Sequence, residues 1–180
     1  MSHPDHFALF ALPVRFALDE TALERAHKDV QSKVHPDRFA SGSAAERRVA
    51  MQWAAQANEA YRTLKSPLAR ASYLCERAGV AINAESNTSM PGSFLGQQLE
   101  WRESLDDARR NDDAAQLGVL IATVTAERDR LIGAIECAID DARDHVAASV
   151  LVRQLMFIDR FRDEVRAAEE VLSRPREASA

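Results

Sequence analysis

A histidine and an aspartate flank a proline in the stretch Lys-Val-His-Pro-Asp-Arg-Phe at residues 33–39. The His35 imidazole can donate or accept a hydrogen bond, and the Asp37 carboxylate is an acceptor suited to an arginine of a partner. Pro36 fixes its own φ and disfavours helical geometry at His35, so the two side chains sit on a stiff loop. The stretch either presents these groups to a partner or merely ends a helix.

Two helices are expected to position this tripeptide. Asp19 is a predicted N-cap for a helix over residues 20–34, and Ser43 with Glu46 has the spacing of a capping box that opens a second helix. Their apolar stripes are Leu23, Ala26, Val30 and Val34 in the first helix, and Ala50, Trp53, Ala57, Tyr61 and Leu64 in the second. Because the loop between them is short, the helices should lie antiparallel and carry the tripeptide at an exposed tip.

The rest of the chain also has helical periodicity, which predicts an all-α fold. A short helix is expected from Pro67 to Ala78, ended by Gly79, and residues 83–93 are polar and rich in turn formers. Three amphipathic stretches follow and can bury one another's apolar faces as a small bundle. The predicted division is a hairpin domain at 1–75, a connecting segment at 76–93, a three-helix bundle at 94–174 and a tail at 175–180.

Composition narrows the cellular compartments in which the protein is expected. There is no run of eighteen apolar residues, no basic-then-apolar start typical of a secretory signal, and two distant cysteines, Cys75 and Cys137, that fit a reducing cytoplasm. We expect both cysteines to be buried as small apolar residues. His27 has no second metal ligand nearby and is expected at the surface.

Charge is unevenly divided between the two halves. Residues 1–70 hold ten Lys/Arg and eight Asp/Glu, a balance of +2, and residues 71–180 hold thirteen and twenty, a balance of −7. The acidic half argues against a nucleic-acid binder. Two modules with different partners would account for the asymmetry, as would chance variation between helical surfaces.

The hairpin resembles a J-domain, the module that stimulates DnaK-type ATPases. The match includes Leu23, Ala26, Val30 and Lys33 upstream of the tripeptide, and Asn-Glu-Ala-Tyr-Arg-Thr-Leu-Lys-Ser-Pro at 58–67 downstream. A second His-Pro-Asp at residues 3–5 has no preceding helix and is interpreted as coincidence. The chain departs from the usual J-domain pattern at four positions. Val34 replaces a frequent tyrosine before the histidine, and Ser66 replaces a frequent aspartate before Pro67. Glu24 and Asp29 replace frequent lysines, which thins the basic face of the first helix.

The whole chain is similar to the HscB family, the J-type co-chaperones of bacterial iron–sulfur cluster assembly. The segments that carry this resemblance are DHFALFALPVRFALDE at the start, HPDRFASGSAAE around the loop, SFLGQQLEWRESLDDA at 93–108 and VRQLMFIDRFRDEV near the end. The resemblance implies a J-domain that docks on a DnaK/HscA-type ATPase chaperone and a bundle that binds an IscU-type scaffold protein. It implies no catalysis by this chain, no cofactor, no metal and no membrane.

Two sets of site residues follow from this resemblance. The expected chaperone-binding residues are His35, Pro36 and Asp37 with the basic Arg25, Lys28 and Lys33. The expected scaffold-binding residues are Leu95, Gly96, Leu99, Glu100, Glu103 and Phe157, where Phe157 lies off the stripe of its helix. Gly96 stands where the family usually has a larger apolar residue. The alternatives are that Arg25 and Lys28 are only a solvated face, and that the leucines and Phe157 are core.

Two rival classes stay open at this point. A general J-domain co-chaperone for other clients would share the hairpin, and only dependence on a scaffold distinguishes it. An enzyme needs convergent groups in a pocket, and no nucleophile elbow, phosphate loop or paired metal motif is visible in the sequence.

Overall fold

All regular secondary structure that the computed structural model describes, over residues 5–34, 43–82 and 90–173, is helical. The elements are α1 (His6–Leu9), α2 (Glu20–Val34), α3 (Ala44–Lys65), α4 (Pro67–Arg77), α5 (Gly92–Arg110), α6 (Ala114–Glu136), the π-helical turn η2 (Cys137–Asp141) and α7 (His145–Ser173). The all-α prediction is therefore confirmed, and α3 and α4 begin where Ser43 and Pro67 indicated.

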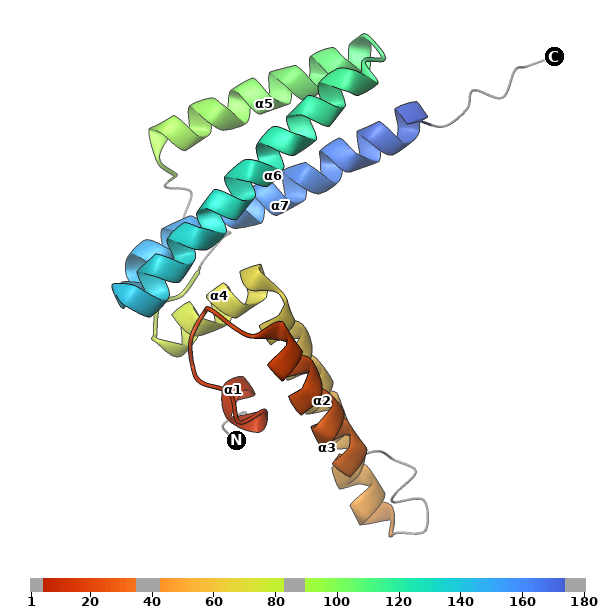
Figure 1. Cartoon of the computed structure of the whole chain (residues 1–180), viewed down its shortest axis with the longest axis vertical. Helices are drawn as coiled ribbons and strands as arrows, with labels where there is room; N and C mark the ends of the chain where they lie inside the picture. Colours follow the sequence, from red (N-terminus) through yellow and green to blue (C-terminus); the bar gives the residue numbers. More distant parts are fainter. Residues whose placement is uncertain (1–4, 35–42, 83–89, 174–180) are drawn as a thin grey trace, which may run out of the picture.

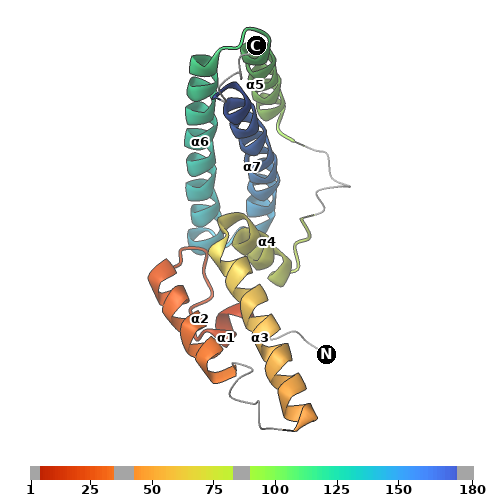
Figure 2. The ribbon, with the colours of Figure 1, turned by 90° about the vertical axis from the view of Figure 1, so that its right-hand side faces the viewer.

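The helices form two elongated bodies that meet at an elbow (Figures 1 and 2). The lower body holds α1, α2 and α3, and the upper body holds α5, α6 and α7. Helix α4 lies at the elbow, where it packs against α3 on one side and α7 on the other. The buried side chains of both bodies belong to one continuous hydrophobic core, so the two bodies share their packing at the joint.

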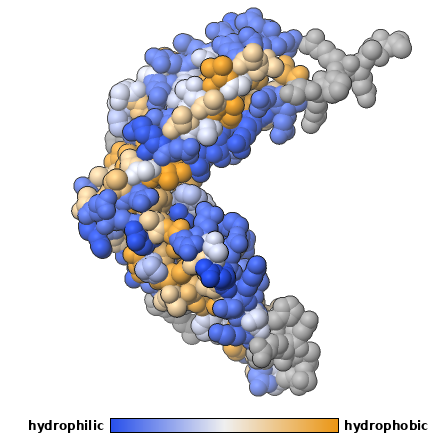
Figure 3. Space-filling view, in the orientation of Figure 1, coloured by the Kyte–Doolittle hydropathy of each residue, from blue (hydrophilic) through white to orange (hydrophobic). Residues whose placement is uncertain are grey.

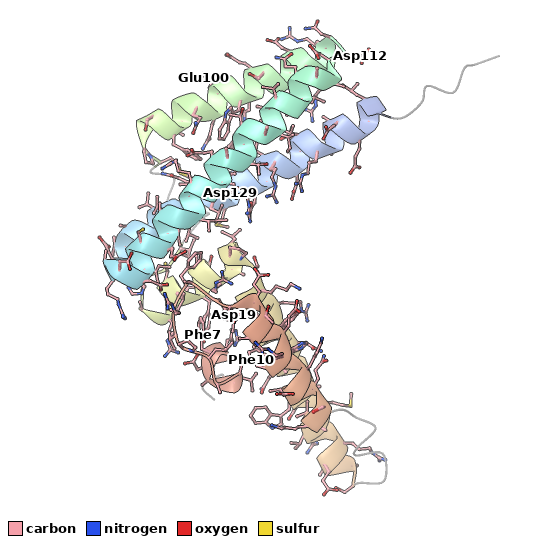
Figure 4. All side chains as sticks on the ribbon, viewed as in Figure 1. Phe7, Phe10, Asp19, Glu100, Asp112 and Asp129 are labelled. Atoms are coloured by element: carbon pink, nitrogen blue, oxygen red, sulfur yellow. The ribbon has the colours of Figure 1, made fainter. Side chains whose placement is uncertain are left out.

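The hairpin of α2 and α3 is set by its caps. Asp19 accepts hydrogen bonds from the backbone N–H groups of Thr21 and Ala22 at 2.9 and 3.1 Å, and it marks the start of α2 in Figure 4. Ser43 and Glu46 form the complete capping box of α3. These contacts satisfy N–H groups that a helix start leaves without partners. Both predicted helix starts are confirmed.

The stripe predicted for α3 is buried at three of its five positions, and Tyr61, at a fourth, is only half-buried. Ala50, Ala57 and Leu64 are buried as expected, but the Trp53 side chain is 42 % exposed. Helices α1, α2 and α4 pack against α3, and together they leave much of the indole uncovered. Helical spacing predicted Trp53 to be buried, because periodicity does not show how much of a helix surface its neighbours cover.

A polar and aromatic cluster joins α2 to α3. The Oδ1 atom of Asn58 lies 3.1 Å from His27 Nε2 and 3.0 Å from Gln31 Nε2, and the His27 ring stacks on Tyr61 with centroids 4.1 Å apart. Phe10 meets the edge of the same imidazole at 6.0 Å. The prediction of a plain surface position for His27 is therefore wrong, because the residues that half-bury it come from α1 and α3.

The upper body is a three-helix bundle around one aromatic and aliphatic core. Trp101 of α5 stacks on Phe161 of α7 at 5.9 Å between ring centroids, which ties the first helix to the third. The largest of the other fully buried side chains of the bundle are Leu105, Leu117, Val124, Leu131, Ile135, Leu155 and Ile158. Each recurs at helical spacing, as the amphipathic pattern predicted.

The elbow is closed by a carboxylate from the end of the bundle. Asp140, in η2, accepts hydrogen bonds from the backbone N–H groups of Phe16 and Ala17 at 2.6 and 2.8 Å. Arg15 Nε lies 3.5 Å from the same carboxylate, whose side chain is only 8 % exposed. The segment between α1 and α2 is thereby fastened to the bundle across more than 120 residues of sequence.

A second polar joint holds the N-terminus onto α4. The Asp5 carboxylate accepts from the Phe7 N–H at 3.0 Å and pairs with Arg77 and the Tyr73 hydroxyl. Burial opposes ionisation of Asp5, but the Phe7 N–H and the Arg77 guanidinium outweigh it and hold the pKa of Asp5 below its usual value. The aspartate of the second His-Pro-Asp copy therefore has a structural role as the cap of α1.

The two cysteines have opposite environments. Cys75 is completely buried in α4, and this burial raises the pKa of its thiol to about 11. Cys137 is exposed on the outer side of η2, so the prediction of burial is wrong for this residue. The inward positions at this end of the bundle are occupied by Ile135 and Ile139.

Replacement of Asp140 with alanine should lower the free energy of unfolding by about 1–3 kcal/mol, because two partly buried N–H groups lose their acceptor. Urea unfolding followed by circular dichroism measures the change. Asp141→Ala is the matched control, since Asp141 is exposed in the same turn and should shift stability by less than about 0.5 kcal/mol. Equal stability of both variants would contradict the role assigned to Asp140.

Candidate chaperone and scaffold interfaces

The tripeptide His35, Pro36 and Asp37 lies outside the described residues. Its flanks are described: α2 ends at Val34, and α3 begins at Ala44. Both flanks lie at the end of the hairpin that is farthest from the bundle (Figure 1). The described ends of α2 and α3 therefore lie at the outer end of the lower body, and the exposed position of the tripeptide itself stays a prediction.

The capping box of α3 fixes where that connection ends. The Ser43 N–H and hydroxyl donate to Glu46 Oε2 at 2.7 and 2.9 Å. These two bonds lower the pKa of the exposed Glu46. The ionised carboxylate also suits the positive end of the helix, so the first turn of α3 is a firm base beside the tripeptide segment.

The predicted basic residues of α2 are exposed, but they do not form one uninterrupted patch. Arg25, Lys28 and Lys33 all face solvent, and Arg25 Nε donates to the carbonyl of Thr21 at 3.3 Å. Helical spacing places the exposed Asp29 between the directions of Arg25 and Lys33. The surface of α2 is therefore of mixed charge.

Two further basic residues belong to the same end of the hairpin. Arg47 and Arg48 are exposed near the start of α3, directly after the capping box of Ser43 and Glu46. The sequence shows these two arginines just after a predicted helix start. The prediction of chaperone-binding residues did not include them, because it followed the family pattern in the preceding helix. Exposed cationic groups from both α2 and α3 therefore belong to the described hairpin.

The predicted scaffold-binding leucines are on the surface of the bundle. Leu95 is 50 % exposed and Leu99 is 60 % exposed, one turn apart on α5. Gly96, Glu100 and Glu103 are exposed as well, and Glu100 is labelled on α5 in Figure 4. The alternative that the two leucines are core does not hold. We name Leu95 and Leu99, with the three residues above, the α5 patch.

Phe157 lies beside this helix but is half-buried. Its ring meets the edge of Phe94 at 5.8 Å and stacks on Phe161 at 5.9 Å. The Arg102 guanidinium lies over the ring, 5.6 Å from its centroid. The predicted exposure of Phe157 is therefore only partly met. Phe94 and Arg102, which lie against the ring, belong to α5, so the residue pattern of α7 alone could not reveal this contact.

Arg102 is a residue of this surface that sequence reasoning missed. Helical spacing puts Arg102 in line with Leu95 and Leu99, whereas Glu100 points about 100° away from Leu99. The exposed line along α5 is thus two leucines followed by an arginine, with Gly96 and the two glutamates on the adjoining side. The charge of Arg102 alone did not predict that this residue lies in line with Leu95 and Leu99 and against the Phe157 ring.

Within residues 5–34, 43–82 and 90–173, no three His, Cys, Asp or Glu side chains come together in a way that could hold a metal ion. In those ranges no helix is long and apolar enough to cross a membrane.

The comparison with known proteins agrees with this arrangement. Residues 90–166 match a family model described as the HSCB C-terminal oligomerisation domain. The chain is 53 % identical over 94 % of its length to a co-chaperone protein HscB homolog of Bordetella pertussis, covering 98 % of that protein. It is 51 % identical over 93 % of its length to a homolog of the same name from Burkholderia cenocepacia, covering 95 % of it.

Two solved structures have the same architecture. The chaperone HscB from Vibrio cholerae superposes with a TM-score of 0.81 at 34 % identity, covering 93 % of this chain and 99 % of that one. The human co-chaperone protein HscB superposes with a TM-score of 0.86 over 93 % of this chain and 83 % of that one; at 23 % identity it supports the fold alone. From its sequence and its structure, this chain belongs to the HscB family of co-chaperones.

Proposed function

We propose that this protein binds an IscU-type iron–sulfur scaffold through its bundle and delivers it to a DnaK/HscA-type chaperone, whose ATPase it stimulates through the hairpin. The observation that carries the proposal is the placement of two unlike surfaces on one elbow. The flanks of the His-Pro-Asp tripeptide lie at the far end of the hairpin, and the exposed leucines of the α5 patch lie on the other body.

In this proposal the elbow keeps the two binding surfaces near each other. A scaffold held on the α5 patch stays near any chaperone that grips the hairpin, so its effective concentration at the chaperone is raised. The polar joints at Asp140 and Asp5, with α4 packed on both bodies, limit how far the two surfaces can move apart. In this scheme the chain itself performs no chemistry, and His35 and Asp37 act only by contact with the chaperone, in the cytoplasm.

In this proposal residues 1–75 form the module that binds the chaperone, and residues 94–174 form the module that binds the scaffold. The alternative function is a general J-domain co-chaperone for other clients. The exposed leucine pair of the α5 patch favours the scaffold, because a protein surface ordinarily leaves such residues scattered rather than paired along one helix line. Stimulation of the chaperone's ATPase should therefore rise when scaffold protein is added.

We also propose that the bundle self-associates, as the description of the matched family model suggests for its members. The observation in this chain that favours it is an apolar outer face on α6, which carries exposed valine and alanine side chains.

His35→Gln should reduce stimulation of the chaperone's ATPase by at least about ten-fold, because loss of an interaction worth about 1.4 kcal/mol has that effect on binding. Single-turnover ATP hydrolysis by the chaperone, with and without scaffold, measures it. His3→Gln, in the other His-Pro-Asp copy, is the matched control and should keep full stimulation. Full activity of the His35 variant would refute the assignment, while circular dichroism should show both variants folded.

Leu95→Ala combined with Leu99→Ala should weaken scaffold binding by about 10–100-fold, since two apolar side chains are no longer available for burial. Isothermal titration with the scaffold protein measures the affinity. The melting temperature should change by less than about 2 °C because both side chains are half exposed or more. Val146→Ala with Val171→Ala removes exposed apolar groups elsewhere and should bind normally. A large drop in melting temperature would mean that the leucines stabilise the fold instead.

Gly96→Met should strengthen scaffold binding by about three-fold or more. A Cβ added at Gly96 meets no atom within 4 Å, so a longer side chain fits beside Leu99 and enlarges the apolar surface. Gly133→Met is the control, because Gly133 is equally open in a helix and gains the same helix propensity without touching the α5 patch. Unchanged or weaker binding by the Gly96 variant would place this residue outside the interface.

A further inference from the structure

The first half of α6 has the composition of a buried helix. Residues 114–126 read AAQLGVLIATVTA and hold no charged side chain, in a chain where 28 % of residues are charged. Only the side with Leu117, Leu120 and Val124 is buried within the bundle. A helix on the surface of a soluble bundle ordinarily carries charged residues on its opposite side, and this one does not.

The opposite side is exposed and apolar. Val119 is 68 % exposed, and the neighbouring Ala115, Ala122, Thr123 and Ala126 are exposed too; we name these five residues the α6 outer face. Figure 3 shows pale and orange atoms gathered where α6 crosses the front of the bundle in Figure 1. The hydroxyl of Thr123 donates to the Val119 carbonyl at 2.9 Å, so even this residue has its hydrogen-bonding group satisfied within the helix.

The α6 outer face is bordered by charges of opposite sign. Asp113, the N-cap of α6, stands before it, and Asp129 and Arg130 follow it. In Figure 4 the labelled Asp112 and Asp129 mark the two ends of this stretch. Arg130 is 62 % exposed and its pKa is raised, first by its hydrogen bonds to Glu127, so it is a permanent cation at the edge of the apolar surface.

We propose that the α6 outer face binds the same face of a second copy of this chain, with the two α6 helices antiparallel about a two-fold axis near Ala122. This inference rests on the self-association proposed above and assigns it to one surface. In that register residue 130 of one copy lies opposite residue 114 of the other, so Arg130 comes next to Asp113 of the partner copy. Asp129 then lies at the positive N-terminal end of the partner's α6. A parallel pairing would instead bring like charges together.

The size of the surface predicts a weak dimer. Thirteen residues of helix span about 18 Å, and one face of that length is smaller than the ~800 Å² per partner of a standard stable interface. Three of the five side chains are alanine, which lets two helices approach closely, in the 8–10 Å range of packed helices. We therefore expect monomer and dimer to exchange at high protein concentration. The α5 patch is a different surface, and the dimer leaves its leucines available to the scaffold.

Sedimentation equilibrium of the full chain, from about 10 µM to 1 mM, tests the proposal because weak association appears only in that range. The weight-average mass of the unmodified chain should rise above the 20.0 kDa of the monomer as concentration increases. Val119→Glu should abolish the rise, since two carboxylates would face an apolar surface. Val146→Glu is the matched control: Val146 is 65 % exposed on α7, carries the same change of charge and should dimerise normally.

A second readout fixes the register. In a Cys137→Ser background, Ala122→Cys should form a disulfide-linked dimer under mild oxidation faster than Ala126→Cys, because only residue 122 meets its own copy at the axis. A mass that stays at the monomer value overturns both self-association and its location. A dimer that Val119→Glu leaves intact overturns the location alone. Loss of scaffold binding by Val119→Glu would show that the scaffold covers the α6 outer face instead. None of these three results would contradict the proposed co-chaperone function.

Discussion

A single buried carboxylate at the elbow is the interaction on which the geometry of this protein depends. Asp140 lies in η2, just after α6, and accepts hydrogen bonds from two backbone N–H groups of the segment that leads into α2. Loops are ordinarily tied to their neighbours by nearby residues, whereas this one is held by a residue from the other end of the chain. Helix α4 packs on both bodies, so the polar joint and the shared core act together to fix one orientation of the hairpin relative to the bundle.

The described part of the hairpin is stabilised by its helix caps and by one cluster of side chains between α2 and α3. The capping box begins α3, Asp19 begins α2, and the cluster of His27, Asn58 and Tyr61 registers one helix on the other. All of these contacts belong to the described parts of α2 and α3. In our proposal recognition belongs to the tripeptide between these helices, in keeping with the view that function resides in sites carried by folds.

The bundle shows a similar separation between core and surface. Trp101 and Phe161 stack inside it, while Leu95, Leu99 and Val119 are left exposed on two different helices. Exposed apolar side chains cost solubility when they serve no contact, and our proposals assign those on α5 and α6 to partners. The two surfaces face different partners in our proposals, a scaffold on α5 and a second copy on α6, which allows both to be occupied at once.

The sequence by itself determined the helices, their caps and the family, because capping and amphipathic spacing are local and the tripeptide has its full context in the hairpin. It could not determine which residues a neighbouring helix would cover. Trp53, Cys137, His27 and Phe157 were misjudged for that one reason, since exposure depends on the width and position of elements distant in the chain. The joint between Asp140 and the Phe16 N–H joins residues 124 apart, and only the tertiary structure decides such a contact, because no local pattern in either segment encodes the other.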